Sequence, residues 1–180
     1  MSRLQDILAI SKNAKAKLFK KGTILQKPGK LKPYAYFVSK GLLRSYIIDS
    51  KGKEHIYMFA PEEWIIGDLE AMEYNQPIEL YIDCLEDTEV IIFDKDCFFE
   101  YQLSKEQIIN NAQLLYRRIG RLQRRVLMLM GTPAIDRYKY FLKTYPELQN
   151  RVPQHMIASF LGIAPQTLST LKGKIIRSKD

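Results

Sequence analysis

The side chains best suited to chemistry in this sequence lie near its C-terminus, on a predicted helix that opens at Pro165. Leu168 and Leu171 are three residues apart and form its apolar face. The opposite face carries uncharged side chains that can hydrogen-bond to base edges in the major groove of DNA. The residues expected to contact bases or phosphates are Gln154, Gln166, Thr167, Ser169, Thr170, Lys172 and Lys174.

A second short helix is predicted directly before this one. It begins at Pro153, because proline is favoured at the first helical position, and Ile157, Ala158 and Leu161 share one apolar face. Gly162 can end it in left-handed geometry without steric cost. The pair matches the layout of a helix-turn-helix, whose second helix enters the major groove. An ordinary αα-hairpin at the end of a domain is the alternative.

The charge of the chain is concentrated near these helices. Residues 1–103 hold 14 Lys and Arg against 16 Asp and Glu, whereas residues 104–180 hold 14 against 4. A net charge of +10 in the second segment can neutralise DNA phosphates. A membrane surface would attract the same charge, but no apolar run approaches the ~18–20 residues of a spanning helix. We expect no membrane partner.

A heptad repeat indicates a long helix between Ser104 and Met130, with Ser104 and Gln107 as a capping box. Three heptads span about 30 Å, long enough to pair two subunits. A core helix packed on its own domain is the other interpretation. The residues expected at a dimer seam are Ile108, Ala112, Leu115, Ile119, Leu122, Val126 and Leu129.

The first hundred residues read as many short strands separated by turns, which is typical of an antiparallel sandwich or barrel. Asp49 to Gly52 is predicted to be a hairpin turn. A short helix is expected over residues 3–19. The strands are expected at residues 23–26, 34–38, 41–48, 54–59, 80–85 and 89–93.

Several segments, in this order, resemble the Crp/Fnr transcription regulators. They are Phe19 to Gly22, Tyr36 to Arg44, the Gly52 hairpin, Gly67 to Glu70, and the two C-terminal helices from Val152. The resemblance implies an α+β chain: an antiparallel β jelly roll of the cyclic-nucleotide-binding type (1–103), a dimerisation helix (104–130) and a winged-helix or helix-turn-helix DNA-binding domain (131–180). It also implies a homodimer on double-stranded DNA, with RNA polymerase and a small-molecule effector as further partners.

The predicted effector segment departs from relatives that bind cyclic AMP. In those, a Gly-Glu-Leu turn is followed about ten residues later by Arg-Ser or Arg-Thr, whose arginine neutralises the phosphate. Here Ile78 and Glu79 stand at that pair, and a carboxylate repels a phosphate, so cyclic AMP is disfavoured and the effector is unknown. Arg44 contributes only if it points inward; otherwise it is structural or at the surface. The residues assigned to this site are Arg44, Gly67, Asp68, Leu69, Glu70, Ile78 and Glu79.

The predicted DNA-binding helix also differs from that of the Crp/Fnr relatives. Thr170 stands where close relatives often carry a guanine-reading arginine, Ala164 offers no capping oxygen, and Gly173 weakens the helix. We expect base readout that is less centred on guanine. A degenerate dimeric sensor or scaffold that no longer binds DNA is the alternative function.

No motif indicates an enzyme, a metal site or a cofactor. Cys84 and Cys97 lack metal-ligand spacing, His55 and His155 are far apart, and no glycine-rich loop precedes a helix. The N-terminus lacks the apolar region of a signal peptide, so we expect a cytoplasmic protein.

Overall fold

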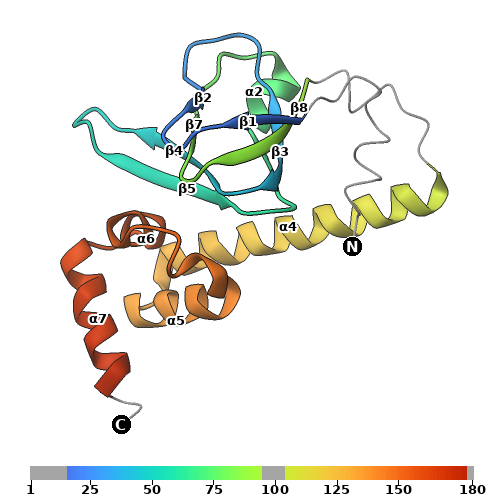
Figure 1. Cartoon of the computed structure of the whole chain (residues 1–180). Helices are drawn as coiled ribbons and strands as arrows, with labels where there is room; N and C mark the ends of the chain where they lie inside the picture. The colour runs from blue at the N-terminus through green and yellow to red at the C-terminus, as the bar shows by residue number, and fades with distance from the viewer. Residues whose placement is uncertain (1–15, 95–103, 178–180) are drawn as a thin grey trace. The chain divides into compact units, whose positions relative to one another are not determined.

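The computed structural model describes residues 16–94 and 104–177, which divide between two compact units, Met1–Asn111 and Ala112–Asp180 (Figure 1). All strands of the described residues lie in the first unit. They are β1 (Ala16–Phe19), β2 (Ile24–Gln26), β3 (Ala35–Lys40), β4 (Leu43–Ile48), β5 (Glu54–Ala60), β6 (Ile65–Gly67), β7 (Tyr81–Cys84) and β8 (Thr88–Phe93). A short helix, α2 (Leu69–Tyr74), follows β6.

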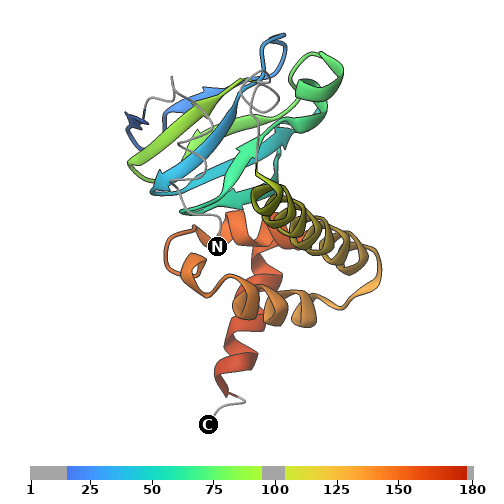
Figure 2. The same cartoon turned by 90° about the vertical axis from the view of Figure 1, so that its right-hand side faces the viewer.

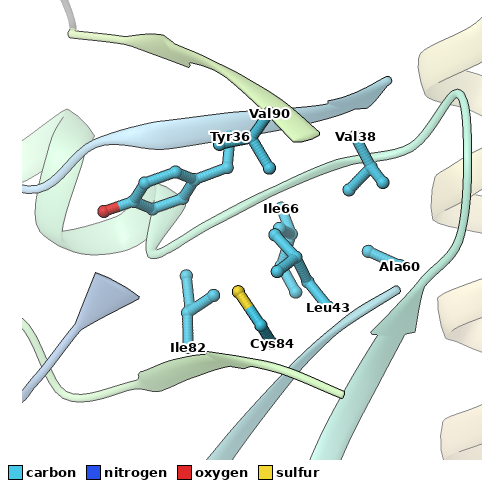
Figure 3. Packing of buried hydrophobic residues seen from close by; sticks show 8 residues of the cluster. All are labelled: Tyr36, Val38, Leu43, Ala60, Ile66, Ile82, Cys84 and Val90. Carbon is cyan, nitrogen blue, oxygen red and sulfur yellow. The ribbon is translucent and has the colours of Figure 1, made fainter. Parts of the chain in front are cut away.

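The strands form two four-stranded sheets with the orders β1-β8-β3-β6 and β2-β7-β4-β5, and every pairing is antiparallel. Alternate residues of both sheets meet between them, as Figure 3 shows. This core contains Tyr36, Val38, Leu43, Ala60, Ile66, Ile82, Cys84 and Val90. The predicted antiparallel sandwich is therefore confirmed.

The first sheet is also buried on its other face. Phe37, Ile91 and Phe93 alternate with the core residues of β3 and β8 and pack against Met72 of α2. Strands that are buried on both faces have continuous apolar sequences, which explains the unbroken apolar segment Val90–Phe93.

The turns that close the strands have the expected chemistry. Asp49 accepts hydrogen bonds at Oδ1 from the backbone N–H groups of Lys51 and Lys53, and Gly52 has a φ of 78°. The predicted hairpin between β4 and β5 is confirmed. Gly41 has a φ of 96°, and a Cβ there would lie 2.6 Å from the carbonyl oxygen of Asp87, so only glycine fits between β3 and β4.

The six predicted strand segments coincide with β2, β3, β4, β5, β7 and β8. The helix predicted over residues 3–19 is wrong for residues 16–19, which form β1, and the rest of that segment lies outside the described residues. Strand β1 pairs along β8, and this distant pairing overrides local helix propensity. Strand β6 and helix α2 were not predicted.

The long predicted helix is α4 (Lys105–Gly131), which runs across the boundary between the two units. Its capping box is confirmed: Gln107 N donates to Ser104 Oγ over 3.2 Å, and Ser104 N donates to Gln107 Oε1 over 2.9 Å. In the described part of the chain, no helix is long and apolar enough to cross a membrane.

The second unit continues with α5 (Ala134–Thr144), the 3₁₀ turn η1 (Pro146–Leu148), α6 (Gln154–Leu161) and α7 (Pro165–Arg177), seen from another side in Figure 2. A wing is a β-hairpin, and between residues 104 and 177 the structure has no strand. The winged form of the predicted domain is therefore wrong for these residues.

Candidate nucleic-acid interface and effector site

The turn between α6 and α7 is set by Gly162, which has φ 65° and ψ 38°. Ile163 N donates to Ala158 O and Gly162 N donates to Ser159 O, each over 3.0 Å. These two bonds make a Schellman turn, which ends α6 and redirects the chain into α7. The predicted tight turn at Gly162 is confirmed.

The apolar faces of the two helices are buried as their spacing predicted. Ile157, Ala158 and Leu161 of α6 and Leu168 and Leu171 of α7 have exposed fractions between 0% and 9%. Phe160 packs with its ring centroid 5.9 Å from that of Phe141 in α5 and 6.0 Å from that of Tyr145, which follows α5. This aromatic cluster anchors α6 on α5. Tyr145 is half-buried in it, and this burial raises the pKa of its hydroxyl group.

The opposite face of α7 is open to solvent. Gln166, Thr167, Ser169, Thr170 and Lys174 are exposed, and Lys172 is half-buried at the edge of the apolar face. Gln154 is exposed at the start of α6. The helix thus brings together most of the residues expected to contact DNA on one polar surface.

Thr170 has a local hydrogen bond that limits its chemistry. Its Oγ1 donates to the carbonyl oxygen of Gln166, one turn earlier, over 3.1 Å. With the hydroxyl proton engaged, Thr170 offers a base an acceptor lone pair and a methyl group.

Positive charge gathers on α4 within the same unit. Burial and repulsion from Arg121 together lower the pKa of Arg118, as expected where like charges are close. Arg124 lies over the ring of Tyr140, 5.9 Å from its centroid. A surface with this excess of cations attracts polyanions.

The heptad row of α4 is exposed within the chain. Ile108, Leu115, Ile119, Leu122, Val126 and Leu129 have exposed fractions from 37% to 58%, and Ala112 is half-buried. A continuous apolar row of this length in water is typical of an interface.

The predicted effector segment is held together by Asp68. Its Oδ1 accepts a hydrogen bond from Ala71 N over 3.2 Å and caps α2. Its Oδ2 accepts from Glu79 N over 2.9 Å and from Leu80 N over 3.2 Å. The structure therefore brings the 67–70 turn to the 78–80 segment, with Asp68 6% exposed.

The other residues assigned to this site differ in exposure. Ile78 is buried, Gly67 is half-buried, and Leu69, Glu70 and Glu79 are exposed. The two backbone donors after Ile78 face the Asp68 carboxylate, so the protein's own anion occupies them. A second anion brought there would be repelled by this carboxylate.

Arg44 is separate from this cluster, and its assignment to the effector site needs correction. Its neighbour Leu43 points into the core of the sandwich, so Arg44 faces the other side of β4. Its Nε and Nη2 donate to the two carboxylate oxygens of Asp83, each over 2.8 Å, and Nη1 donates to Glu54.

The surroundings of Arg44 are those of a structural ion pair. Its guanidinium lies 4.2 Å from the ring centroid of Tyr46, which stacks on Tyr81 at 5.1 Å. Burial disfavours the charge, but the hydrogen bonds to Asp83 and Glu54 outweigh it and raise the pKa of Arg44. Arg44 is therefore a structural arginine, as the alternative interpretation of this residue predicted.

Comparison with known proteins agrees with this geometry. Residues 16–104 match the family model of the cyclic nucleotide-binding domain. The chain carries a cyclic nucleotide-binding domain. No curated protein matches the sequence.

Solved structures extend the likeness beyond this domain. A CooA variant from Carboxydothermus hydrogenoformans is 18% identical, with 98% of this chain and 85% of that chain covered and a TM-score of 0.72. A transcriptional regulator of the CRP/FNR family from Thermus thermophilus is 18% identical, with 91% and 87% covered and a TM-score of 0.66.

The c-di-GMP responsive global regulator CLP from Xanthomonas campestris is 14% identical, with 92% of this chain and 88% of that chain covered and a TM-score of 0.66. At these identities the likeness shows a shared fold. The resemblance to the Crp/Fnr regulators, first seen in short motifs, is confirmed for the domain and the fold.

Within the cyclic nucleotide-binding domain, the internal partners of Asp68 and Arg44 were not predicted. One local signal for α2 was present: an aspartate at the N-cap and an asparagine, Asn75, in left-handed conformation at the other end. No local signal links Arg44 to Asp83, which is 39 residues away.

Proposed function

We propose that this chain is a homodimeric, sequence-specific DNA-binding transcription regulator with an N-terminal effector-sensing domain. The observation that carries the proposal is the polar face of α7, where Gln166, Thr167 and Thr170 are exposed beyond a Gly162 turn. Uncharged donors and acceptors on such a helix suit base edges, and adjacent basic side chains suit phosphates.

The residue types on α7 suggest which bases are read. Gln166 can bond to adenine in bidentate fashion, and the methyl group of Thr170 can touch that of thymine. Lys174 is exposed and can contact a phosphate. No arginine lies on the exposed face of α7 before Arg177, so we expect modest preference for guanine.

Pairing through α4 would place two such helices on one duplex. The occupant proposed for the exposed heptad row is a second copy of this chain, because an a/d repeat is self-complementary along a two-fold axis. Two recognition helices then meet half-sites about 34 Å apart.

We also propose that the effector is not cyclic AMP. The exposed Glu79 carboxylate and the buried Asp68 carboxylate both disfavour a phosphate at the 78–80 segment. The identity of the effector and contact with RNA polymerase stay predictions.

Selection of bound sites from a random duplex pool, with the purified chain and no added ligand, tests DNA binding. An inverted repeat with half-sites one helical turn apart is the expected product. Affinity for it should fall steeply with salt, because lysine and arginine contacts release counterions. A chain that dimerises yet selects no sequence would support the alternative of a sensor or scaffold without DNA binding.

Replacement of Leu122 by Glu tests the dimer. The change buries a carboxylate at the expected seam, and we expect a monomer by sedimentation and loss of binding to the inverted repeat. Gln113→Glu is the control, since Gln113 is exposed on the other side of α4 and the charge change is the same. A Leu122→Glu chain that remains dimeric would show that the seam lies elsewhere.

A further inference from the structure

The carbonyl groups at the end of α6 all have partners within the second unit. A helix leaves its last four carbonyls without helical partners. Ala158 and Ser159 use the Schellman turn described above. Phe160 O accepts from Arg125 Nη2 over 3.2 Å, and Leu161 O accepts from Arg137 Nη1 over 3.0 Å.

The two arginines come from outside the helix-turn-helix. Arg125 belongs to α4 and also lies over the ring of Phe160, 4.3 Å from its centroid. Its hydrogen bond connects α4 to α6 across 35 residues of sequence. A guanidinium at the negative end of a helix is favoured by the helix dipole as well.

Arg137 joins two chain segments at once. Its Nη1 holds Leu161 O, and its Nε donates to Thr132 O over 2.8 Å. Thr132 lies in the short link between the end of α4 at Gly131 and the start of α5 at Ala134. One planar guanidinium therefore fixes the link and the end of α6 in the same geometry.

Side-chain packing does not fill the space where α4, α5 and α6 meet. A pocket opens between α4, α5 and α6, lined by Arg125, Arg137, Met128, Tyr140 and Leu161 among others. The chain approaches α4 closely at Gly162, where a Cβ would lie 3.0 Å from Leu129 Cδ2. Directional hydrogen bonds therefore contribute to the orientation here more than they would in a filled core.

We infer that Arg125 and Arg137 are positioning residues that fix α6 and α7 relative to α4. Their consequence for DNA, the spacing of the two half-sites, rests on the proposed function. Without them α6 keeps its Schellman turn and its apolar face, so the helices persist while their direction relative to α4 becomes variable.

A distance measurement within one chain tests this orientation without DNA. Spin labels on genetically encoded ketone side chains at Tyr116 of α4 and Thr167 of α7, both exposed, leave the native cysteines unchanged. Labelled protein is diluted into excess unlabelled protein, so that only distances within a chain are recorded. Arg137→Gln and Arg125→Gln should broaden the distance distribution.

Arg124→Gln is the matched control, since it removes the same charge one residue from Arg125 and, in the described structure, Arg124 has a ring contact with Tyr140. It should leave the distribution narrow. Arg137→Lys keeps the charge but cannot span both carbonyls in a fixed fork, so it should broaden the distribution as well. Equal distributions in Arg137→Gln, Arg137→Lys and the parent would overturn the inference, even if the parent binds DNA.

Binding to inverted repeats of different spacing gives the second readout. The parent should prefer one spacing, and Arg137→Gln should lose roughly tenfold to a hundredfold in affinity there, as for loss of charged hydrogen bonds. Its preference among spacings should flatten, whereas Arg124→Gln should weaken all spacings equally. If Arg137→Gln and Arg124→Gln both lose the same affinity at every spacing, these arginines contact phosphates and do not set the spacing. If the parent binds no DNA, the proposed function fails while the distance measurement still decides the inference.

Discussion

Asp68 should be one of the most sensitive positions in the cyclic nucleotide-binding domain. Its carboxylate accepts three backbone N–H bonds, from Ala71, Glu79 and Leu80. Asp68→Ala removes both acceptor oxygens, and with them all three hydrogen bonds, and leaves two donors in the segment before β7 without their protein partner.

The magnitude follows from these contacts. Loss of an N-cap costs about 1 kcal/mol. Each of the other two bonds to a charged acceptor contributes about 1.5 kcal/mol, at the low end because these contacts are partly buried. Relief from burying the carboxylate offsets about 1 kcal/mol, so Asp68→Ala should lower the free energy of unfolding by about 3 kcal/mol.

Urea unfolding followed by the fluorescence of Trp64, the single tryptophan, measures this free energy of unfolding, because Trp64 packs on the core of the domain that contains Asp68. Asp68→Asn should lose about 2 kcal/mol, because its amide retains one oxygen for the cap and turns an N–H group toward two donors. Glu70→Gln is the control: Glu70 is an exposed acid in the first turn of α2 and should change stability by less than about 0.5 kcal/mol. If Asp68→Ala and Glu70→Gln have equal effects, the assignment of Asp68 as the link between these segments is refuted.

Two further predictions concern the same domain. Asp83→Leu should lower the free energy of unfolding by about 3 kcal/mol, because Arg44 would stay buried with Glu54 as its remaining ionic partner among the described residues. Urea unfolding of Asp83→Leu beside Glu54→Leu checks this. The side chain of Glu54 is 40% exposed, so Glu54→Leu should lower the free energy of unfolding by less than Asp83→Leu. A larger loss in Glu54→Leu would contradict the assignment of Arg44 and Asp83 as the buried ion pair. Burial raises the pKa of Cys84 to about 11 from 9.0, so at pH 8 its thiol should resist iodoacetamide in the native protein and react in urea, as peptide mass spectrometry can show. Because the pKa of Cys84 is higher in the folded state, its contribution to the free energy of unfolding should be complete below pH 9 and should be lost as the pH rises toward 11. Rapid alkylation of the native thiol at pH 8 would contradict the burial of Cys84.

Local patterns predicted the elements whose causes lie within a few residues. The Ser104–Gln107 capping box, the left-handed turn at Gly162 and the apolar spacing of Leu168 and Leu171 all appear as expected. In each, the interacting groups are at most five residues apart, so the sequence itself brings them together.

Elements that depend on distant partners were missed. Strand β1 pairs with β8, about 70 residues away, and β6 pairs with β3, about 30 residues away. Neither short segment has enough alternating residues to identify it as a strand. The outward direction of Arg44 could not be settled before the sheet was known, because a one-residue change of register reverses the face.

The sequence by itself therefore determined the antiparallel sandwich, the long α4 helix and the polar face of α7, since periodicity and turn residues specify them locally. The tertiary structure alone decided the roles of four side chains. Arg44 and Asp83 meet because β4 lies beside β7, and Arg125 and Arg137 reach α6 because α4 and α5 pack against it. Such pairs depend on which segments become neighbours, and residues whose numbers differ by 24 to 39 carry no local signal that they will meet.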